Sequence, residues 1–317
     1  MYITESPLGD RIQVPDDPRE NEKAFAVEEF VEAFEFYRRC GYALLKNVIS
    51  VDYCSRLRHS FNTELKRYPG LLPRTAGPAA INKFNDRGFL VNAVLNVQRS
   101  CPNAVPTYVT DVLAILTHNS LRTILESMFK GPVGLMTWNH FEANPVTKPH
   151  HDCYFWSDDM KVGEVVGAWV ALETIHPGAG RLYVYPGSHT LDLRQYMASS
   201  GIQGPLLPTS DQHQRAIFEL IKEQDWKCTA PALEAGDVLL WDSRTIHGSL
   251  ATTTPQHSRS SLTSHFSACS GRFIKPRSLR TQFVDGVAVE FPRPNWLRSL
   301  RRLMLLGRPV PWGGSEH

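Results

Sequence analysis

The sequence lacks three features that would point to a secreted or membrane protein. Its six cysteines include no CxxC pair, and its first residues contain no basic segment followed by an apolar run. No apolar stretch is long enough to span a bilayer, because the longest candidates are interrupted by Arg, Pro or Gly. We therefore expect free thiols and a cytoplasmic protein without a membrane span.

The chain also lacks a strong overall charge. The formal net charge is +2 over 317 residues, so no global field indicates nucleic acid as a partner. The local balance is less even, because nine basic and only three acidic residues lie between Arg272 and the end. This basic extension is either a solvated surface or a docking patch for an anionic partner, such as a coenzyme A-linked or carrier-protein-linked substrate.

A hydrophobic content of 42% allows one large domain with a β-rich core and helical additions. Residues 1–22 are polar, contain three prolines and predict an irregular N-terminal arm. Residues 23–131 are predicted to be mainly helical. Within them, one helical pattern stops at Gly41, which suits a helix end, and Ser50 is placed to cap a second helix.

Two further elements are predicted before residue 132. A helix is expected from 109 to 130, ending before Gly131. A strand over 81–86 would carry polar side chains, including that of Lys83, toward a cavity.

The pattern changes in residues 132–268. Turn signals separate short strand-like runs, which favours a β-sandwich or barrel over a parallel sheet with crossovers. The predicted strands cover residues 133–141, 165–172, 182–185, 238–241 and 259–266. Residues 190–226 carry two helical patterns and form an insertion that either covers a site or packs on the surface. In the extension 269–317, Trp296 to Leu306 is an amphipathic helical pattern.

One constellation carries the chemistry. His150 and Asp152 are two residues apart, so on an extended strand both side chains would leave from the same face. His247, after a distant strand, could complete a triangle of ligands. Two imidazoles and one carboxylate suit non-haem Fe(II). The same ligands also suit a zinc-dependent hydrolase or isomerase, which remains the alternative.

Arg259 favours the iron hypothesis. A buried arginine near a metal requires an anion, because an unpaired guanidinium in a low-dielectric site is costly and its fork matches a carboxylate. A 2-oxo acid could chelate the metal through its first carboxylate and keto oxygen while its far carboxylate binds Arg259. Zinc hydrolysis requires no such anion site.

The order of these motifs resembles that of the phytanoyl-CoA dioxygenase family. The likeness covers about Phe34 to Phe266 and rests on His150-x-Asp152, on the Gly178 to His189 segment, on Ala235-Gly236-Asp237, on His247-Gly248-Ser249 and on Arg259. The resemblance implies a mainly β fold with flanking helices, built on a double-stranded β-helix of the jelly-roll, cupin-like type. It also implies dependence on Fe(II), 2-oxoglutarate and O2.

Carried over by position, the resemblance implies a role for seven residues. His150, Asp152 and His247 would bind iron, and Arg259 would hold the distal carboxylate of 2-oxoglutarate. Ser249 would add a hydroxyl to that carboxylate, Trp169 would line the cosubstrate pocket, and Lys83 would assist from its strand.

The residues near these motifs are not predicted to bind the metal. His151 should point to the opposite strand face and support the site, and Cys153 is not expected to bind the metal. His189 and His265 are expected to be structural. Tyr154, Phe155 and Trp156 either form a wall of the substrate pocket or belong to the core. Arg181 and Asn139 either reach the cavity or bind backbone groups.

The predicted function is a dioxygenase that hydroxylates or otherwise oxidises a small molecule with release of succinate and CO2. The substrate would be a natural-product intermediate or an acyl or carrier-linked metabolite. Related halogenases have a small residue in place of the carboxylate, so Asp152 argues against halide transfer. Desaturation, ring formation and epimerisation remain open, as does a monomeric or homodimeric state. A non-catalytic binding protein of the same fold is a further alternative.

Overall fold

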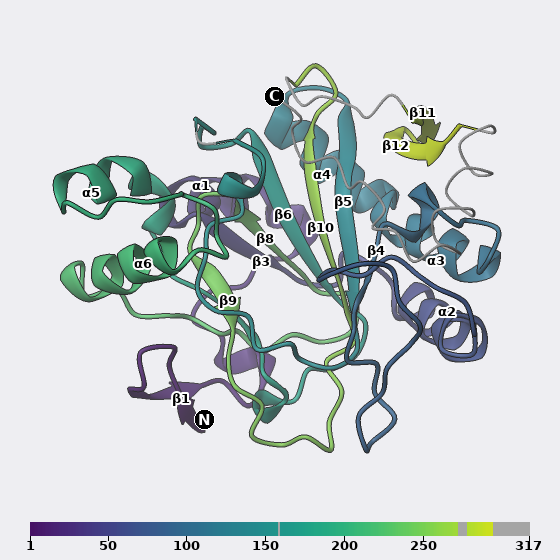
Figure 1. The fold of residues 1–317 in the computed structure, drawn as a ribbon, viewed down its shortest axis with the longest axis horizontal. Helices are drawn as coiled ribbons and strands as arrows, with labels where there is room; N and C mark the ends of the chain where they lie inside the picture. Colours follow the sequence, from purple (N-terminus) through teal and green to yellow (C-terminus); the bar gives the residue numbers. More distant parts are fainter. Residues whose placement is uncertain (158, 272–277, 294–317) are drawn as a thin grey trace.

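One large sheet runs through the centre of the molecule (Figure 1). The computed structural model describes residues 1–157, 159–271 and 278–293. The strands follow the order β11 (Leu279–Val284), β12 (Val287–Pro292), β5 (Val133–Phe141), β10 (Ser261–Ala268), β6 (Val165–Ala171), β8 (Val238–Asp242) and β3 (Tyr42–Leu45), with β4 (Val94–Leu95) beside β5. Neighbours from β5 to β3 are antiparallel. The predicted strands of the core are confirmed within a few residues.

A second, smaller sheet faces the first. It contains β7 (Leu182–Val184) and β9 (His247–Ser249). Single bridges extend it on both sides, from His247 to His150 and from Val184 to Thr229. Four segments therefore face the four strands β5, β10, β6 and β8. This arrangement is the double-stranded β-helix expected from the sequence.

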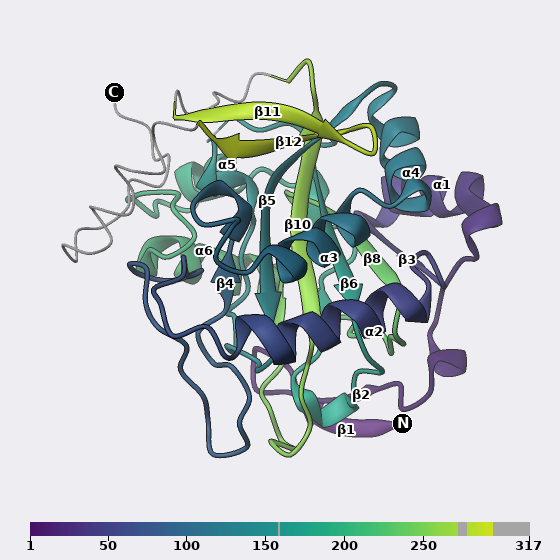
Figure 2. The same cartoon turned by 90° about the vertical axis from the view of Figure 1, so that its right-hand side faces the viewer.

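Alternation along β6 separates the two faces of the large sheet. Val166, Ala168 and Val170 join a core with the helices on one face, whereas Trp169 joins a cluster with residues of the small sheet. The helices on the first face are α2 (Val51–Ser60), α3 (Pro106–Leu116) and α4 (Asn119–Phe129). In Figure 2, α2 and α3 lie in front of the sheet and α5 and α6 behind it.

The helix ends test the local predictions. Helix α1 (Phe30–Cys40) ends at Gly41, whose φ of 78° confirms the predicted C-cap. Helix α2 begins after Ser50 as predicted, although the Ser50 side chain makes no capping hydrogen bond. The single helix predicted over 109–130 is wrong. The chain turns before α4, where the His118 ring accepts a hydrogen bond from the backbone N–H of Ser120.

Two other predictions are corrected. The arm 1–22 is not wholly irregular, because β1 (Tyr2–Glu5) and β2 (Arg11–Val14) form an antiparallel hairpin. The strand predicted over 81–86 does not form: an isolated bridge joins Phe84 to Leu90, and Lys83 is exposed. Polar side chains in and near that segment bind the loop's own backbone: Asn85 Oδ1 accepts from the N–H of Arg87, and Asn92 Oδ1 accepts from that of Lys83.

The insertion and the extension complete the described fold. The insertion forms α5 (Leu193–Ser199) and α6 (Asp211–Glu223), both helices as predicted. Strands β11 and β12 form a hairpin that meets β5 through Ala288 and Gly134. The helix predicted from Trp296 to Leu306 lies outside the described residues. Among those described, no helix has the length and apolar character needed to cross a membrane. Short turns of other helical types are η1 (Pro18–Glu20), η2 (Val27–Glu29), η3 (Phe61–Leu65), η4 (Val97–Arg99), η5 (Cys153–Phe155), η6 (Pro177–Ala179) and η7 (Ser188–Thr190).

Candidate active site

The segment that carries His150 and Asp152 turns sharply between the two residues. The backbones of His150 and His247 exchange hydrogen bonds of 3.0 and 3.1 Å. Asp152 has helical angles, φ −70° and ψ −33°, and begins the 3-10 turn η5. The predicted continuous strand is therefore wrong. The side chains nevertheless converge, because Asp152 Oδ1 lies 3.4 Å from His150 Nε2 and Asp152 Oδ2 lies 3.3 Å from His247 Nε2.

Backbone carbonyls orient both imidazoles. His150 Nδ1 lies 2.9 Å from the carbonyl oxygen of Lys148, and His247 Nδ1 lies 3.0 Å from that of Thr245. Only a protonated nitrogen can donate to a carbonyl, so the lone pair of each neutral ring is on Nε2. One ligand atom from each of His150, Asp152 and His247 lies within 4.8 Å of the others. The three residues can therefore hold a metal ion.

Asp152 is fixed by two donors from the large sheet. Its Oδ2 accepts hydrogen bonds from Trp241 Nε1 at 2.9 Å and from His265 Nε2 at 2.8 Å. Trp241 lies on β8 and His265 on β10, and both are buried. Hydrogen-bonded outer groups of this kind orient metal ligands. His265, expected to be structural, thus has a defined contact with a predicted ligand.

Burial and neighbouring groups set the charges at this centre. Burial opposes ionisation of Asp152, yet His247 and His265 hold the pKa of its carboxyl well below the usual range. Burial lowers the pKa of His247 to about 4, against the opposing effect of Asp152. Burial also acts on His150, but hydrogen bonding to Asp152 raises the pKa of that ring. An anionic carboxylate beside a neutral His247 is the state in which these groups bind a metal.

Arg259 is a buried cation. Its side chain is 3% exposed, and burial lowers the pKa of the guanidinium only to about 10, so the group is charged at neutral pH. Nη1 makes a long hydrogen bond of 3.3 Å to the carbonyl oxygen of Gly180, and Nε has no hydrogen-bond partner among the described residues. The guanidinium carbon lies 5.6 Å from the ring centre of Phe141 and 5.8 Å from that of Trp169. Within the described ranges, no acidic group forms an ion pair with Arg259.

Ser249 lies on β9, two residues after His247, and is 5% exposed. Its Oγ accepts a hydrogen bond of 2.7 Å from the backbone N–H of Thr147, which leaves the hydroxyl proton available to a ligand. The structure thus brings the three predicted metal ligands together and places Trp169 against Arg259. It does not bring Lys83 to them on a strand, so we leave Lys83 out of the proposed site.

Part of the inner face of the large sheet remains accessible. Thr137 and Asn139 on β5 and Thr263 on β10 are half-buried, although most of their strand neighbours are buried. Asn139 Oδ1 accepts from Thr75 Oγ1 at 2.9 Å, and Thr137 Oγ1 accepts from Asn96 Nδ2 at the same distance. These groups form a neutral polar wall. Arg181, in contrast, donates to backbone carbonyls of the N-terminal part and of the turn before η6.

The three aromatic residues after the ligands separate into two roles. Tyr154 is buried in a core cluster. Phe155 is 48% exposed, with its ring centre 6.1 Å from that of His150 in an edge-on arrangement. Trp156 is half-buried and lies edge-on to His265 at 5.0 Å. Phe155 and Trp156 therefore flank the metal-binding group, formed by His150, Asp152 and His247, at its accessible side.

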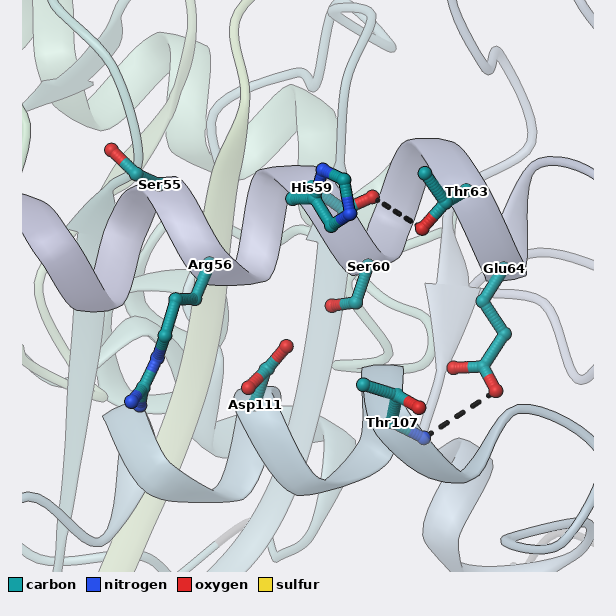
Figure 3. Close-up of a pocket in the computed structure, with 8 residues that line it drawn as sticks. All are labelled: Ser55, Arg56, His59, Ser60, Thr63, Glu64, Thr107 and Asp111. Carbon is teal, nitrogen blue, oxygen red and sulfur yellow. Dashed lines mark hydrogen bonds between the residues drawn. The ribbon is translucent and has the colours of Figure 1, made fainter.

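A separate groove of about 590 Å³ lies between α2 and α3. Figure 3 shows Arg56 and His59 on α2 with Asp111 on the opposite helix. Glu64 reaches across the groove and accepts hydrogen bonds from the first backbone N–H groups of α3, at Thr107 and Tyr108. The groove contains none of the predicted site residues. We interpret it as a surface gap between two helices that Glu64 ties together.

Sequence reasoning missed Trp241 and the carbonyl of Gly180. Trp241 lies two residues after Leu239, which pairs with Trp169, so strand alternation could have placed Trp241 on the same face as Trp169. Nothing in the sequence indicates which acceptor its indole finds. Gly180 has a left-handed backbone, with φ 84°, and this conformation sets the direction of its carbonyl. A Cβ at this residue would lie 1.9 Å from Asn144 Nδ2.

The profile of the family described as phytanoyl-CoA dioxygenase (PhyH) matches residues 37–261, well over half of the chain. The chain belongs to the phytanoyl-CoA dioxygenase family. It is an Fe(II)- and 2-oxoglutarate-dependent dioxygenase, and O2 is its cosubstrate, as the sequence predicts. No curated protein matches the sequence.

Solved structures share the fold. The epimerase SnoN, in complex with Fe3+, alpha ketoglutarate and nogalamycin RO, is 18% identical with a TM-score of 0.56, covering 91% of this chain and 93% of that chain. EctD from S. alaskensis, with 2-oxoglutarate and 5-hydroxyectoine, is 19% identical with a TM-score of 0.55, covering 94% and 89%. The carbocyclase SnoK from nogalamycin biosynthesis is 20% identical with a TM-score of 0.55, covering 78% and 87%.

Proposed function

We propose that His150, Asp152 and His247 bind the iron and that Arg259 binds the distal carboxylate of 2-oxoglutarate. The observation that carries the proposal is the state of Arg259, a buried charge whose Nε has no hydrogen-bond partner in the described part of the chain. A buried guanidinium is costly unless an anion pairs with it. A dicarboxylate that reaches from the metal to Arg259 supplies that anion.

The chain's own residues then have separate tasks. The two histidines present Nε2 because backbone carbonyls bind Nδ1, and Trp241 and His265 hold Asp152 Oδ2. Iron bound there would supply the redox chemistry that activates dioxygen while 2-oxoglutarate is converted to succinate and CO2.

The second group of residues binds the cosubstrate. Ser249 donates its hydroxyl proton to the same carboxylate as Arg259, because its lone pairs already accept from Thr147. The rings of Phe141 and Trp169 cover the guanidinium and exclude water from it. This removal of water strengthens the attraction between the two opposite charges.

For the substrate, we propose a free small molecule with an apolar ring system and hydroxyl groups, such as a natural-product intermediate. Phe155 and Trp156 supply apolar ring surface at the accessible side of the metal-binding group. The wall that contains Asn139 and Thr137 offers neutral hydrogen-bonding groups to such a body. SnoN and SnoK, described as enzymes from nogalamycin biosynthesis, support a natural-product intermediate as the substrate class.

The site assignment is tested without a substrate. Anaerobic addition of Fe(II) and 2-oxoglutarate should give a weak visible charge-transfer band, and His150→Ala should lose it. His59→Ala is the matched control, because His59 is exposed on α2 and should leave the band intact. A band of unchanged intensity in His150→Ala, or turnover supported by zinc, would refute the assignment.

The substrate class is tested by succinate release across a panel. The panel contains ring-bearing natural-product intermediates, acyl-coenzyme A and carrier-linked acyl groups, and small amino-acid derivatives. Phe155→Ala should raise the KM for the accepted substrate several-fold and leave the KM for 2-oxoglutarate unchanged. Phe283→Ala is the control, since Phe283 is 66% exposed on β11. Succinate release with the carrier-linked compounds alone would contradict the proposal.

A further inference from the structure

Helix α6 of the insertion packs against the outside of the turn that carries His150 and Asp152. Figure 1 shows α5 and α6 beside β9, on the side of the small sheet. The buried residues of α6 share a core cluster with Cys153 and Tyr154, which follow the predicted ligands directly. These α6 residues are Ala216, Ile217, Leu220 and Ile221. The insertion is thus joined to the predicted metal-binding turn by a continuous core.

Gln214 binds the carbonyl that precedes the first ligand. Its Nε2 donates to the backbone oxygen of Pro149 at 3.1 Å and to that of Pro208 at 3.0 Å. Because both neighbours are carbonyl oxygens, the side-chain amide must turn its nitrogen toward them, and this fixes its orientation. The Oε1 atom is buried and has no partner in the part of the chain that the structure describes. The amide therefore connects the loop before α6 to the residue before His150.

The rings of His151, Tyr154 and His213 pack against one another beside the two predicted ligands. His151, which separates His150 from Asp152, is 1% exposed, and neither of its ring nitrogens has a hydrogen-bond partner among the described atoms. Its ring lies edge-on to His213 at 6.0 Å and to Tyr154 at 5.7 Å, and His213 lies edge-on to Tyr154 at 5.8 Å. The contacts of His151 are thus ring packing against α6 and its own turn.

His213 is itself held in place. Its Nδ1 lies within hydrogen-bond distance of the Leu206 carbonyl, 2.6 Å away, and its backbone N–H donates to Ser210 Oγ at the start of α6. A second connection ties the insertion to the other ligand segment: Arg244, three residues before His247, donates from Nη2 to the carbonyl oxygen of Leu191 at 2.8 Å. The insertion therefore contacts both segments that carry predicted ligands.

The local backbone explains why such a support is needed. His150 is bridged to the small sheet and the Thr147 carbonyl accepts from the N–H of Ser249, but the chain leaves the extended conformation before Asp152. A strand would hold consecutive ligands through its ladder of hydrogen bonds, and this turn has no such ladder. We propose that α6 positions His150 and Asp152 through Gln214 and His213, so that the insertion sets the affinity of the site for its metal. The inference rests on the proposed assignment of these ligands.

The test measures metal affinity and stability separately. Gln214→Ala and Gln214→Glu both lose the donors to Pro149, and the second keeps the size of the side chain. Losing that hydrogen bond, worth about 1 kcal/mol, corresponds to a Kd for Co(II) about fivefold higher. Gln224→Ala, an exposed residue at the C-terminal end of the same helix, should match the unmodified protein.

Thermal unfolding of the metal-free variants in EDTA is the second measurement. A positioning role predicts weaker Co(II) binding with a metal-free Tm close to that of Gln224→Ala. Co(II) affinity that is unchanged in both Gln214 variants would overturn the inference, whatever their Tm. If neither Gln214 variant folds, His213→Leu provides the same comparison, because it removes the ring that contacts His151 and should also weaken Co(II) binding.

His150→Ala distinguishes this inference from the site assignment. Loss of Co(II) binding in His150→Ala together with unchanged affinity in the Gln214 variants would overturn only the role of α6. Unchanged Co(II) affinity in His150→Ala would overturn the assignment of the ligands, and the inference with it.

Discussion

The indole of Trp241 donates a hydrogen bond of 2.9 Å to Asp152 Oδ2, across 89 residues of sequence. The bond fixes the orientation of the carboxylate, in which Oδ2 lies 3.3 Å from His247 Nε2 and Oδ1 lies 3.4 Å from His150 Nε2. A residue on the large sheet thereby fixes a predicted ligand that lies in an irregular turn. The position of Asp152 depends on this contact as much as on its own backbone.

Trp241→Phe should therefore weaken metal binding. The substitution keeps an aromatic ring but removes the donor, and loss of a hydrogen-bonded outer group costs roughly 10- to 100-fold in metal affinity. Co(II) titration of the purified variant measures the effect. Trp226→Phe is the control, because Trp226 is half-buried after α6. Equal affinities in the two variants would show that the indole does not orient Asp152.

Gly167→Ala should lower both stability and metal affinity. Gly167 pairs with Trp241, and a Cβ at this residue would lie 2.2 Å from the indole ring. The ring must therefore shift, and overpacking of this kind typically costs about 1–3 kcal/mol. Urea denaturation should show that loss, and Co(II) titration should show weaker binding because the donor to Asp152 moves. A variant with normal stability and normal Co(II) affinity would contradict the packing described here.

Arg259→Ala should act on the cosubstrate. Truncating one partner of a buried, hydrogen-bonded charge pair costs roughly 2–5 kcal/mol, which corresponds to at least about a 30-fold rise in the Kd for 2-oxoglutarate. Anaerobic titration of the Fe(II)-loaded variant with 2-oxoglutarate measures this change. Arg19→Ala, which loses an arginine with an 89% exposed side chain in the N-terminal arm, should bind normally. Normal 2-oxoglutarate binding by Arg259→Ala would remove Arg259 from the site.

Asp242 should make the free energy of unfolding depend on pH. Its carboxylate is fully buried and accepts from the N–H groups of Gly163 and Arg244 at 2.6 and 2.9 Å, but burial raises its pKa from 3.8 to about 6. The folded state then keeps a proton that the unfolded chain loses above pH 3.8. The resulting stabilisation is fully present below pH 3.8 and is lost as the pH rises to about 6.

Asp242→Asn removes this titration and isolates the effect. A shift of two pKa units corresponds to about 3 kcal/mol. Between pH 4 and pH 6.5 the unmodified protein should therefore lose up to that amount of unfolding free energy relative to the variant. Urea denaturation at several pH values measures the difference. A difference that stays constant across this range would be inconsistent with a raised pKa.

Local patterns predicted most of the core. The strand-like runs at residues 133–141 and 165–172, separated by turn signals, predicted β5 and β6. Gly41 predicted the end of α1, since a left-handed residue there favours glycine. Local patterns failed in the segment 81–86 and at His118, where side chains satisfy backbone groups of a loop or a new helix and override the periodicity.

The sequence by itself determined which ligand types the protein has and the order in which the chain presents them. His150, Asp152, His247 and Arg259 are recognisable because the donor chemistry of a side chain does not depend on its surroundings. Only the tertiary structure decided how these groups are held. The turn at Asp152, its anchoring by Trp241 and its support by Gln214 depend on contacts between segments far apart in the chain. No local propensity specifies such contacts, because their free energy exists only when the two segments pack together.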